Sequence, residues 1–126
     1  MIGADTSFLI DFFKGDNDAV EWMGEHSNVL YLCENVVYEF LCGNLTEDER
    51  QTFLGFVLQF PVIEFDREAA LKASDIYREG KRKGETVPHP DAMIAGTYVS
   101  HEVKKIVTCN IDRFDQIDGI SVVEYP

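Results

Sequence analysis

Three carboxylates, Asp5, Glu39 and Asp91, lie in segments whose pattern otherwise calls for burial. Asp5 ends the apolar opening of the chain, Glu39 lies inside an apolar helical pattern, and Asp91 begins an apolar stretch. A buried carboxylate is costly unless it is paired or binds a metal, and no lysine or arginine stands beside any of the three in sequence. Oxygen ligands without histidine or cysteine favour Mg²⁺ or Mn²⁺, which serve phosphate chemistry. The pattern therefore predicts a metal-dependent reaction at a phosphate ester.

Each candidate also has an ordinary structural explanation. Asp5 and Asp91 each stand at the start of a predicted helix, where aspartate is a preferred N-cap. Glu39 would form a surface ion pair if its helix were exposed, and Asn110 and Asp112 are residue types that favour turns. The joint arrangement is more informative than any one residue, because parallel strands bring their carboxyl ends to one edge of a sheet.

The elements that must position these residues alternate between strands and helices. Short apolar segments predict five strands, at residues 1–4, 29–32, 62–65, 105–108 and 120–125. Apolar periodicity predicts helices at residues 7–13, 18–26, 35–42, 47–60, 67–83 and 91–98. This alternation indicates an α/β fold, a three-layer α/β/α arrangement around a central, mostly parallel five-stranded sheet. The length of 126 residues predicts one domain spanning residues 1–126.

Two local signals sharpen the helix boundaries. Thr46 followed three residues later by Glu49 fits a capping box at a helix start. Pro88, His89 and Pro90 predict an extended approach to the helix at Asp91, because a residue before proline avoids the helical region.

Composition and charge limit the classes of function. The apolar content of 45% is ordinary for a globular domain, and no apolar run approaches the roughly 20 residues of a membrane span. The start of the chain lacks the features of a signal peptide, so we expect a cytoplasmic protein with no membrane contact. The three cysteines include no Cys-x-x-Cys pair, and reduced thiols are expected.

The net charge of −12 argues against nucleic-acid binding unless the acids hold cations or a basic patch lies nearby. One dense basic cluster exists and is a candidate for RNA contact; its members are Arg78, Lys81, Arg82 and Lys83. The same residues suit the C-terminus of a solvated helix, where cations interact favourably with the helix dipole. Both interpretations stay open.

Four segments, in order, resemble the motifs of the PIN-domain family, especially its small VapC-type toxin ribonucleases. They are Met1-Ile2-Gly3-Ala4-Asp5-Thr6-Ser7, Val36-Val37-Tyr38-Glu39-Phe40-Leu41, Pro90-Asp91-Ala92-Met93-Ile94-Ala95 and Val107-Thr108-Cys109-Asn110-Ile111-Asp112-Arg113-Phe114. The resemblance extends over nearly the whole chain. A receiver domain would need two adjacent acids after its first strand, where this chain has Asp5-Thr6. A haloacid-dehalogenase-type phosphatase would need an aspartate at the position of Ser7.

The resemblance assigns roles to the candidate residues. It implies that Mg²⁺ or Mn²⁺ is held by the catalytic acids, namely Asp5, Glu39, Asp91 and Asp112. Polar side chains that would orient these acids are Thr6, Ser7, Thr108 and Asn110. The hydroxyl residues among them, Thr6, Ser7 and Thr108, equally suit satisfied positions at a helix start, and both interpretations stay open. The chain departs from the family pattern at two positions. Asn110 fills a position that is often aspartate, and Arg113 stands before Phe114, where an acidic residue is common.

The activity implied is a metal-dependent endoribonuclease that cleaves RNA phosphodiester bonds, as the toxin of a toxin-antitoxin pair. A small antitoxin protein in the acidic groove and a homodimer are implied with it. The departures at Asn110 and Arg113 leave an alternative, a catalytically inactive PIN-like domain that binds RNA or protein.

Overall fold

A five-stranded sheet forms the centre of the computed structural model, which describes residues 1–125. Its strands are β1 (Ile2–Ala4), β2 (Leu30–Cys33), β3 (Val62–Ile63), β4 (Lys105–Val107) and β5 (Ser121–Val123). The strand order is β3-β2-β1-β4-β5, and every neighbouring pair is parallel. The sheet therefore confirms the predicted α/β class, and β1 at its centre carries Asp5 at its carboxyl end.

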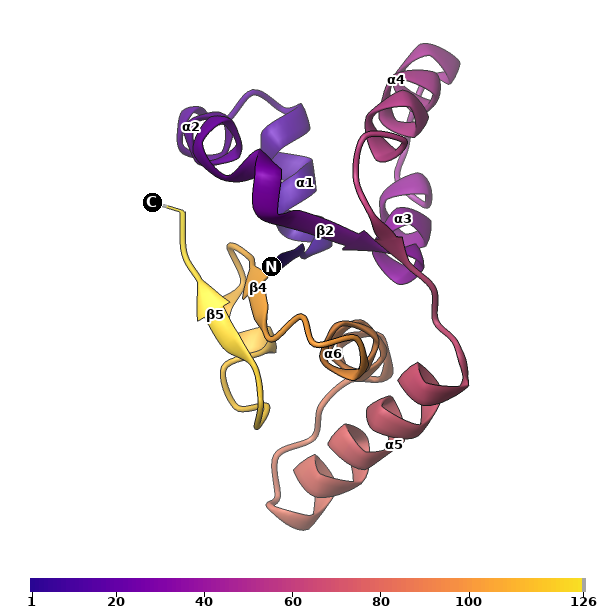
Figure 1. The fold of residues 1–126 in the computed structure, drawn as a ribbon, viewed down its shortest axis with the longest axis vertical. Coiled ribbons are helices and arrows are strands. Elements are labelled where there is room, and N and C mark those ends of the chain that lie inside the picture. Colours follow the sequence, from indigo (N-terminus) through magenta and orange to yellow (C-terminus); the bar gives the residue numbers. More distant parts are fainter. Residues whose placement is uncertain (126) are drawn as a thin grey trace.

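Helices cover both faces of this sheet. They are α1 (Thr6–Phe13), α2 (Asn17–His26), α3 (Glu34–Leu41), α4 (Glu47–Val57), α5 (Arg67–Arg82) and α6 (His89–Ser100). Two short 3₁₀ helices are η1 (Ser27–Val29) and η2 (Ile111–Arg113). Figure 1 shows α1 and α2 on one side of the strands and α5 and α6 on the other, the three-layer arrangement expected. Within residues 1–125, no helix is long and apolar enough to cross a membrane.

Tyr98 fixes α6 against the centre of the sheet. Its side chain is fully buried, and its hydroxyl donates a hydrogen bond to the carbonyl oxygen of Ala4 at 2.6 Å. Its ring lies directly over Gly3, where an added Cβ would come within 2.6 Å of the ring carbons. Glycine is therefore required in β1, and the close approach holds α6 beside the strand that ends at Asp5.

The starts of α4 and α6 test the two sequence signals for helix boundaries, the capping box and the prolines before Asp91. The capping box is present: Glu49 N–H donates to Thr46 Oγ1 at 3.1 Å, and Thr46 N–H donates to Glu49 Oε1 at 2.9 Å. The extended approach predicted for residues 88–90 holds at Pro88, whose φ is −57° and ψ 146°, and is wrong for His89 and Pro90, because α6 begins at His89. First-turn N–H groups have no intrahelical acceptor, so Pro90 costs the helix no hydrogen bond. Asp91 consequently lies in the first turn and is not an N-cap.

Candidate active site

The carboxyl ends of β1 and β4 lie side by side and place Asp5 at the centre of the site. Asp5 N–H donates to the carbonyl oxygen of Val107 at 3.0 Å, which continues the pairing of the two strands. Asp5 occupies the N-cap position of α1, yet its side chain makes no capping bond. The side chain is nevertheless completely buried. Its carboxylate therefore needs partners other than the helix, and the structure supplies them from distant segments.

Two hydroxyl groups hold one oxygen of Asp5. Oδ2 accepts a hydrogen bond from Ser7 Oγ at 2.8 Å and another from Thr108 Oγ1 at 2.8 Å. The two hydroxyl oxygens are 3.0 Å apart. The backbone N–H of Cys109 donates to Ser7 Oγ at 3.2 Å, and the backbone N–H of Asn110 donates to Thr108 Oγ1 at 2.9 Å. The geometry thus places Ser7 and Thr108 where they orient Asp5. Asn110 contributes its backbone N–H to this network.

A single arginine joins Asp5 to Asp91. Nη1 of Arg113 lies 3.2 Å from both carboxylate oxygens of Asp5. Nε donates to Asp91 Oδ1 at 2.9 Å, and Nη2 donates to the same oxygen. Burial disfavours the charged guanidinium, but the hydrogen bond to Asp91 and the charge of Asp5 outweigh it and raise the pKa of Arg113 above its ordinary value. Arg113 is therefore a permanent cation shared by two buried carboxylates.

Glu39 reaches the same region from α3. It is partly buried, and its Oε1 accepts a hydrogen bond from Thr6 Oγ1 at 2.5 Å. Its negative charge also contributes to the raised pKa of Arg113. Asp5 and Asp91 share the guanidinium of Arg113, while Glu39 is held near Asp5 by Thr6 and forms no ion pair with the arginine. Thr6 orients Glu39 as Ser7 and Thr108 orient Asp5.

The pairing with Arg113 was not foreseen from the sequence, and it changes the role of the segment after β4. Arg113 is 22 residues from Asp91 and 108 residues from Asp5 along the chain. The one available signal was the reversal of charge at this position relative to the common family pattern. Asp112 is exposed, and within residues 1–125 its carboxylate forms no hydrogen bond or ion pair. Its neighbour in η2 faces the acids instead, so the role of Asp112 as a fourth acid stays a prediction.

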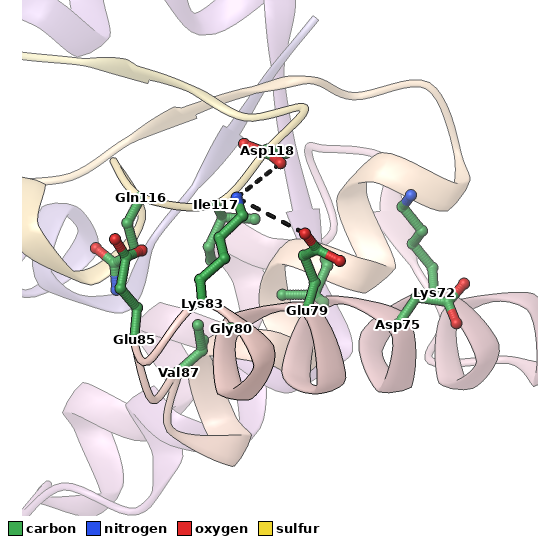
Figure 2. A pocket seen from close by; sticks show the side chains of 11 residues that line it. Lys72, Asp75, Glu79, Gly80, Lys83, Glu85, Val87, Gln116, Ile117 and Asp118 are labelled. Carbon is green, nitrogen blue, oxygen red and sulfur yellow. Dashed lines mark hydrogen bonds and ion pairs between the residues drawn. The ribbon is translucent and has the colours of Figure 1, made fainter.

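The basic cluster divides into two halves. Lys83 Nζ lies 2.9 Å from Asp118 Oδ2 and 4.0 Å from Glu79 Oε1. Figure 2 shows Lys83 between these two acids. Arg82 also pairs with Glu79. Arg78 and Lys81 are exposed and form no ion pair within the described chain. Acids of the same chain therefore pair with Arg82 and Lys83, whereas Arg78 and Lys81 pair with no acid within residues 1–125.

The donor set fits a hard divalent cation in its chemistry. Asp5, Asp91 and Glu39 supply carboxylate oxygens and no nitrogen or sulfur, which suits Mg²⁺ or Mn²⁺. Among residues 1–125, however, no three acidic, histidine or cysteine side chains converge closely enough to hold an ion as they stand. The guanidinium of Arg113 contacts both aspartates instead.

Comparisons of the sequence and of the fold with known proteins point to the same family. The model of the PIN domain family matches residues 3–120. The chain is 32% identical to Ribonuclease VapC11 of Mycobacterium tuberculosis, over 96% of this chain and 94% of that protein. It is 27% identical to Ribonuclease VapC3 of Methanocaldococcus jannaschii, over 75% of this chain and 94% of the relative. The fold is similar to that in the DNA-bound VapBC structure from Salmonella typhimurium, with a TM-score of 0.85 and 24% identity over 99% of this chain and 98% of the other.

Proposed function

The chain belongs to the PIN-domain family, and from this premise we propose that it is a metal-dependent endoribonuclease that cleaves RNA phosphodiester bonds. The observation that carries the proposal is the pair of buried carboxylates, Asp5 and Asp91, at the carboxyl edge of a parallel sheet, with Glu39 hydrogen-bonded to Thr6 next to Asp5. Two buried aspartates sharing a single cation are costly to fold, which argues for a chemical role rather than a structural one.

The roles of the protein groups follow from their contacts. Asp5, Asp91 and Glu39 would hold Mg²⁺ or Mn²⁺, which supplies an activated water and stabilises charge on the phosphate. Ser7 and Thr108 both bind Oδ2 of Asp5, so Oδ1 is the oxygen that these hydroxyls leave free for a cation. The bond from Thr6 limits the orientations of Glu39 in the same way. The hydroxyl groups thus position the carboxylates, and the carboxylates bind the ion.

Cleavage of single-stranded RNA by the purified protein tests the proposal. We expect cleavage with Mg²⁺ or Mn²⁺ and none in EDTA. Asp91→Asn should lower turnover by orders of magnitude because it removes a charged ligand at constant size, and Asp75→Asn, an exposed control on α5, should not. Undiminished cleavage in EDTA would refute the metal mechanism. Retained RNA binding without cleavage under every divalent ion would support the inactive RNA-binding module instead.

We further propose that the chain is the toxin of a toxin-antitoxin pair acting in the cytoplasm. The support is similarity to proteins named as VapC ribonucleases and a fold shared with VapBC complexes. A small antitoxin protein is then the expected partner and should inhibit RNA cleavage when it is co-purified with the chain. The toxin-antitoxin pairing would be contradicted if a small protein encoded beside this gene bound the chain and left RNA cleavage unchanged.

Homodimerisation is the remaining part of the proposal. Tyr38 of α3 is 69% exposed and Phe65 is 38% exposed, and both line one surface pocket with Met93. Exposed aromatic side chains gathered at one place support a self-association surface. Light scattering coupled to gel filtration should give twice the chain mass of 14.3 kDa. A monomer mass at every concentration would exclude the dimer.

A further inference from the structure

We propose that Arg113 is an internal cation of the metal site, one that a divalent ion must displace and that therefore sets the metal affinity of the protein. The inference rests on the proposed metal-dependent function and names a regulator of the same site. It identifies Arg113 as a residue that acts on metal binding, rather than as a ligand of the metal or of the RNA.

The contacts of the guanidinium make this competition unavoidable. Nη1 bonds to Asp5, while Nε and Nη2 both bond to Asp91, so one group is shared between the two carboxylates. The side chains of Asp5 and Asp91 are 0% and 7% exposed, and that of Arg113 is 22% exposed. Charge-assisted hydrogen bonds of this kind are strong where water is largely excluded. An ion bound by both aspartates would replace the positive charge that Arg113 now provides, and the two cations would repel each other if both stayed.

The backbone around Arg113 permits the side chain to leave without unfolding the site. The next residue, Phe114, is fully buried and anchors the end of η2 in the core. The guanidinium carbon of Arg113 lies 5.2 Å from the centre of the Phe114 ring, at the boundary between the core and solvent. The side chain of Arg113 is already 22% exposed, so rotation about its own bonds, with loss of the contact to Phe114, would take the guanidinium to water. We infer that metal binding moves this one side chain and leaves the fold unchanged.

The displacement has a consequence for stability as well as for affinity. Without a divalent ion, Arg113 offsets one of the two negative charges of Asp5 and Asp91 and reduces their repulsion. The protein should therefore bind metal more weakly than the same acids would without the arginine. The protein would respond to divalent ions only at concentrations high enough to displace Arg113.

Mn²⁺ binding, measured by isothermal titration calorimetry, tests the inference without measuring catalysis. Arg113→Gln removes the charge, and Arg50→Gln on α4 removes the same charge from an exposed position as a matched control. We expect Arg113→Gln to bind Mn²⁺ about 10- to 100-fold more tightly than wild type, the fold-change that corresponds to losing one charge-assisted contact. Arg50→Gln should match wild type. In EDTA, Arg113→Gln should melt at a lower temperature than wild type. Addition of Mn²⁺ should raise the melting temperature of Arg113→Gln by more than it raises that of wild type.

Arg113→Lys keeps the experiment decisive if the glutamine variant does not fold. A lysine ammonium lacks the fork that binds both aspartates, so the affinity for Mn²⁺ should lie above wild type and below Arg113→Gln. Equal Mn²⁺ affinity in wild type and in the folded Arg113 variants, with metal-dependent cleavage intact, would overturn the inference and leave the proposed function standing. Binding of Mn²⁺ by the Arg113 variants alone would support the inference and refute metal-dependent cleavage by wild type. No binding in any protein would overturn both.

Discussion

The hydroxyl of Thr108 offers a sharp test of how the fold holds Asp5. Thr108 is 1% exposed, and its Oγ1 donates to Asp5 Oδ2 at 2.8 Å while it accepts Asn110 N–H at 2.9 Å. Thr108→Val removes this oxygen and keeps the shape of the side chain. The carboxylate would retain Ser7 and Arg113, so the substitution weakens the network without leaving Asp5 unpaired.

The cost can be worked out from these contacts. A hydrogen bond to a charged group contributes roughly 1.5–3 kcal/mol. The N–H of exposed Asn110 can turn to water, which limits its share to well under about 1 kcal/mol. We therefore expect Thr108→Val to lower the free energy of unfolding by about 2–3 kcal/mol. For a chain of this size, that loss corresponds to a fall of roughly 10 °C in the melting temperature.

Urea unfolding followed by circular dichroism at pH 7 in EDTA would measure this loss. Thr108→Ser keeps the hydroxyl and loses one methyl group, so it should cost only about 1 kcal/mol. Thr52→Val on the exposed side of α4 should change stability by less than about 0.5 kcal/mol. Two results would refute the reasoning: a Thr108→Val variant as stable as wild type, or a Thr108→Ser variant as unstable as Thr108→Val. The second result would show that the loss of stability comes from the missing methyl group and not from the missing hydroxyl group.

Two further predictions concern the surface and the core. Replacing Arg78 and Lys81 with glutamine should weaken RNA binding and flatten its salt dependence, measured by fluorescence anisotropy across a KCl series, because these cations form no ion pair within residues 1–125. The same change at the acid-paired Arg82 and Lys83 should have a smaller effect, and equal salt slopes in the two double variants would contradict the assignment. Burial raises the pKa of the Cys33 thiol to about 12, so iodoacetamide at pH 8 should alkylate the two exposed cysteines and spare Cys33. Peptide mass spectrometry would detect the outcome, and equal labelling of all three would show that Cys33 is accessible.

The architecture could be predicted from the sequence because its signals are local. A capping box joins residues three apart, so Thr46 and Glu49 reveal a helix start without knowledge of the rest of the chain. The start of α6 could not be placed correctly in this way. The avoidance of helix before proline is a weak preference, and packing of the buried helix around Tyr98 outweighs it at His89.

The acids of the site were visible for a different reason. Asp5, Glu39 and Asp91 interrupt apolar patterns, and such interruptions can be seen without a structure. The partner of two of them could not be found by the same means. Arg113 and Asp112 are adjacent in η2, and only the backbone of that turn determines which of the two side chains faces the acids. A residue choice based on charge alone therefore favours Asp112, whereas the structure brings Arg113 into contact.

The site exists only when the sheet is complete, and this links folding to chemistry. Asp5 stands at the end of β1, while Thr108 and Arg113 follow β4, which is about a hundred residues later and pairs directly with β1. Before that pairing forms, Asp5 has Ser7 as its only nearby partner among these groups. Pairing of β1 with β4 therefore both buries the carboxylate of Asp5 and brings the hydroxyl of Thr108 and the guanidinium of Arg113 to it. The cost of burying two aspartates is thus offset by groups that the same strand pairing brings to them.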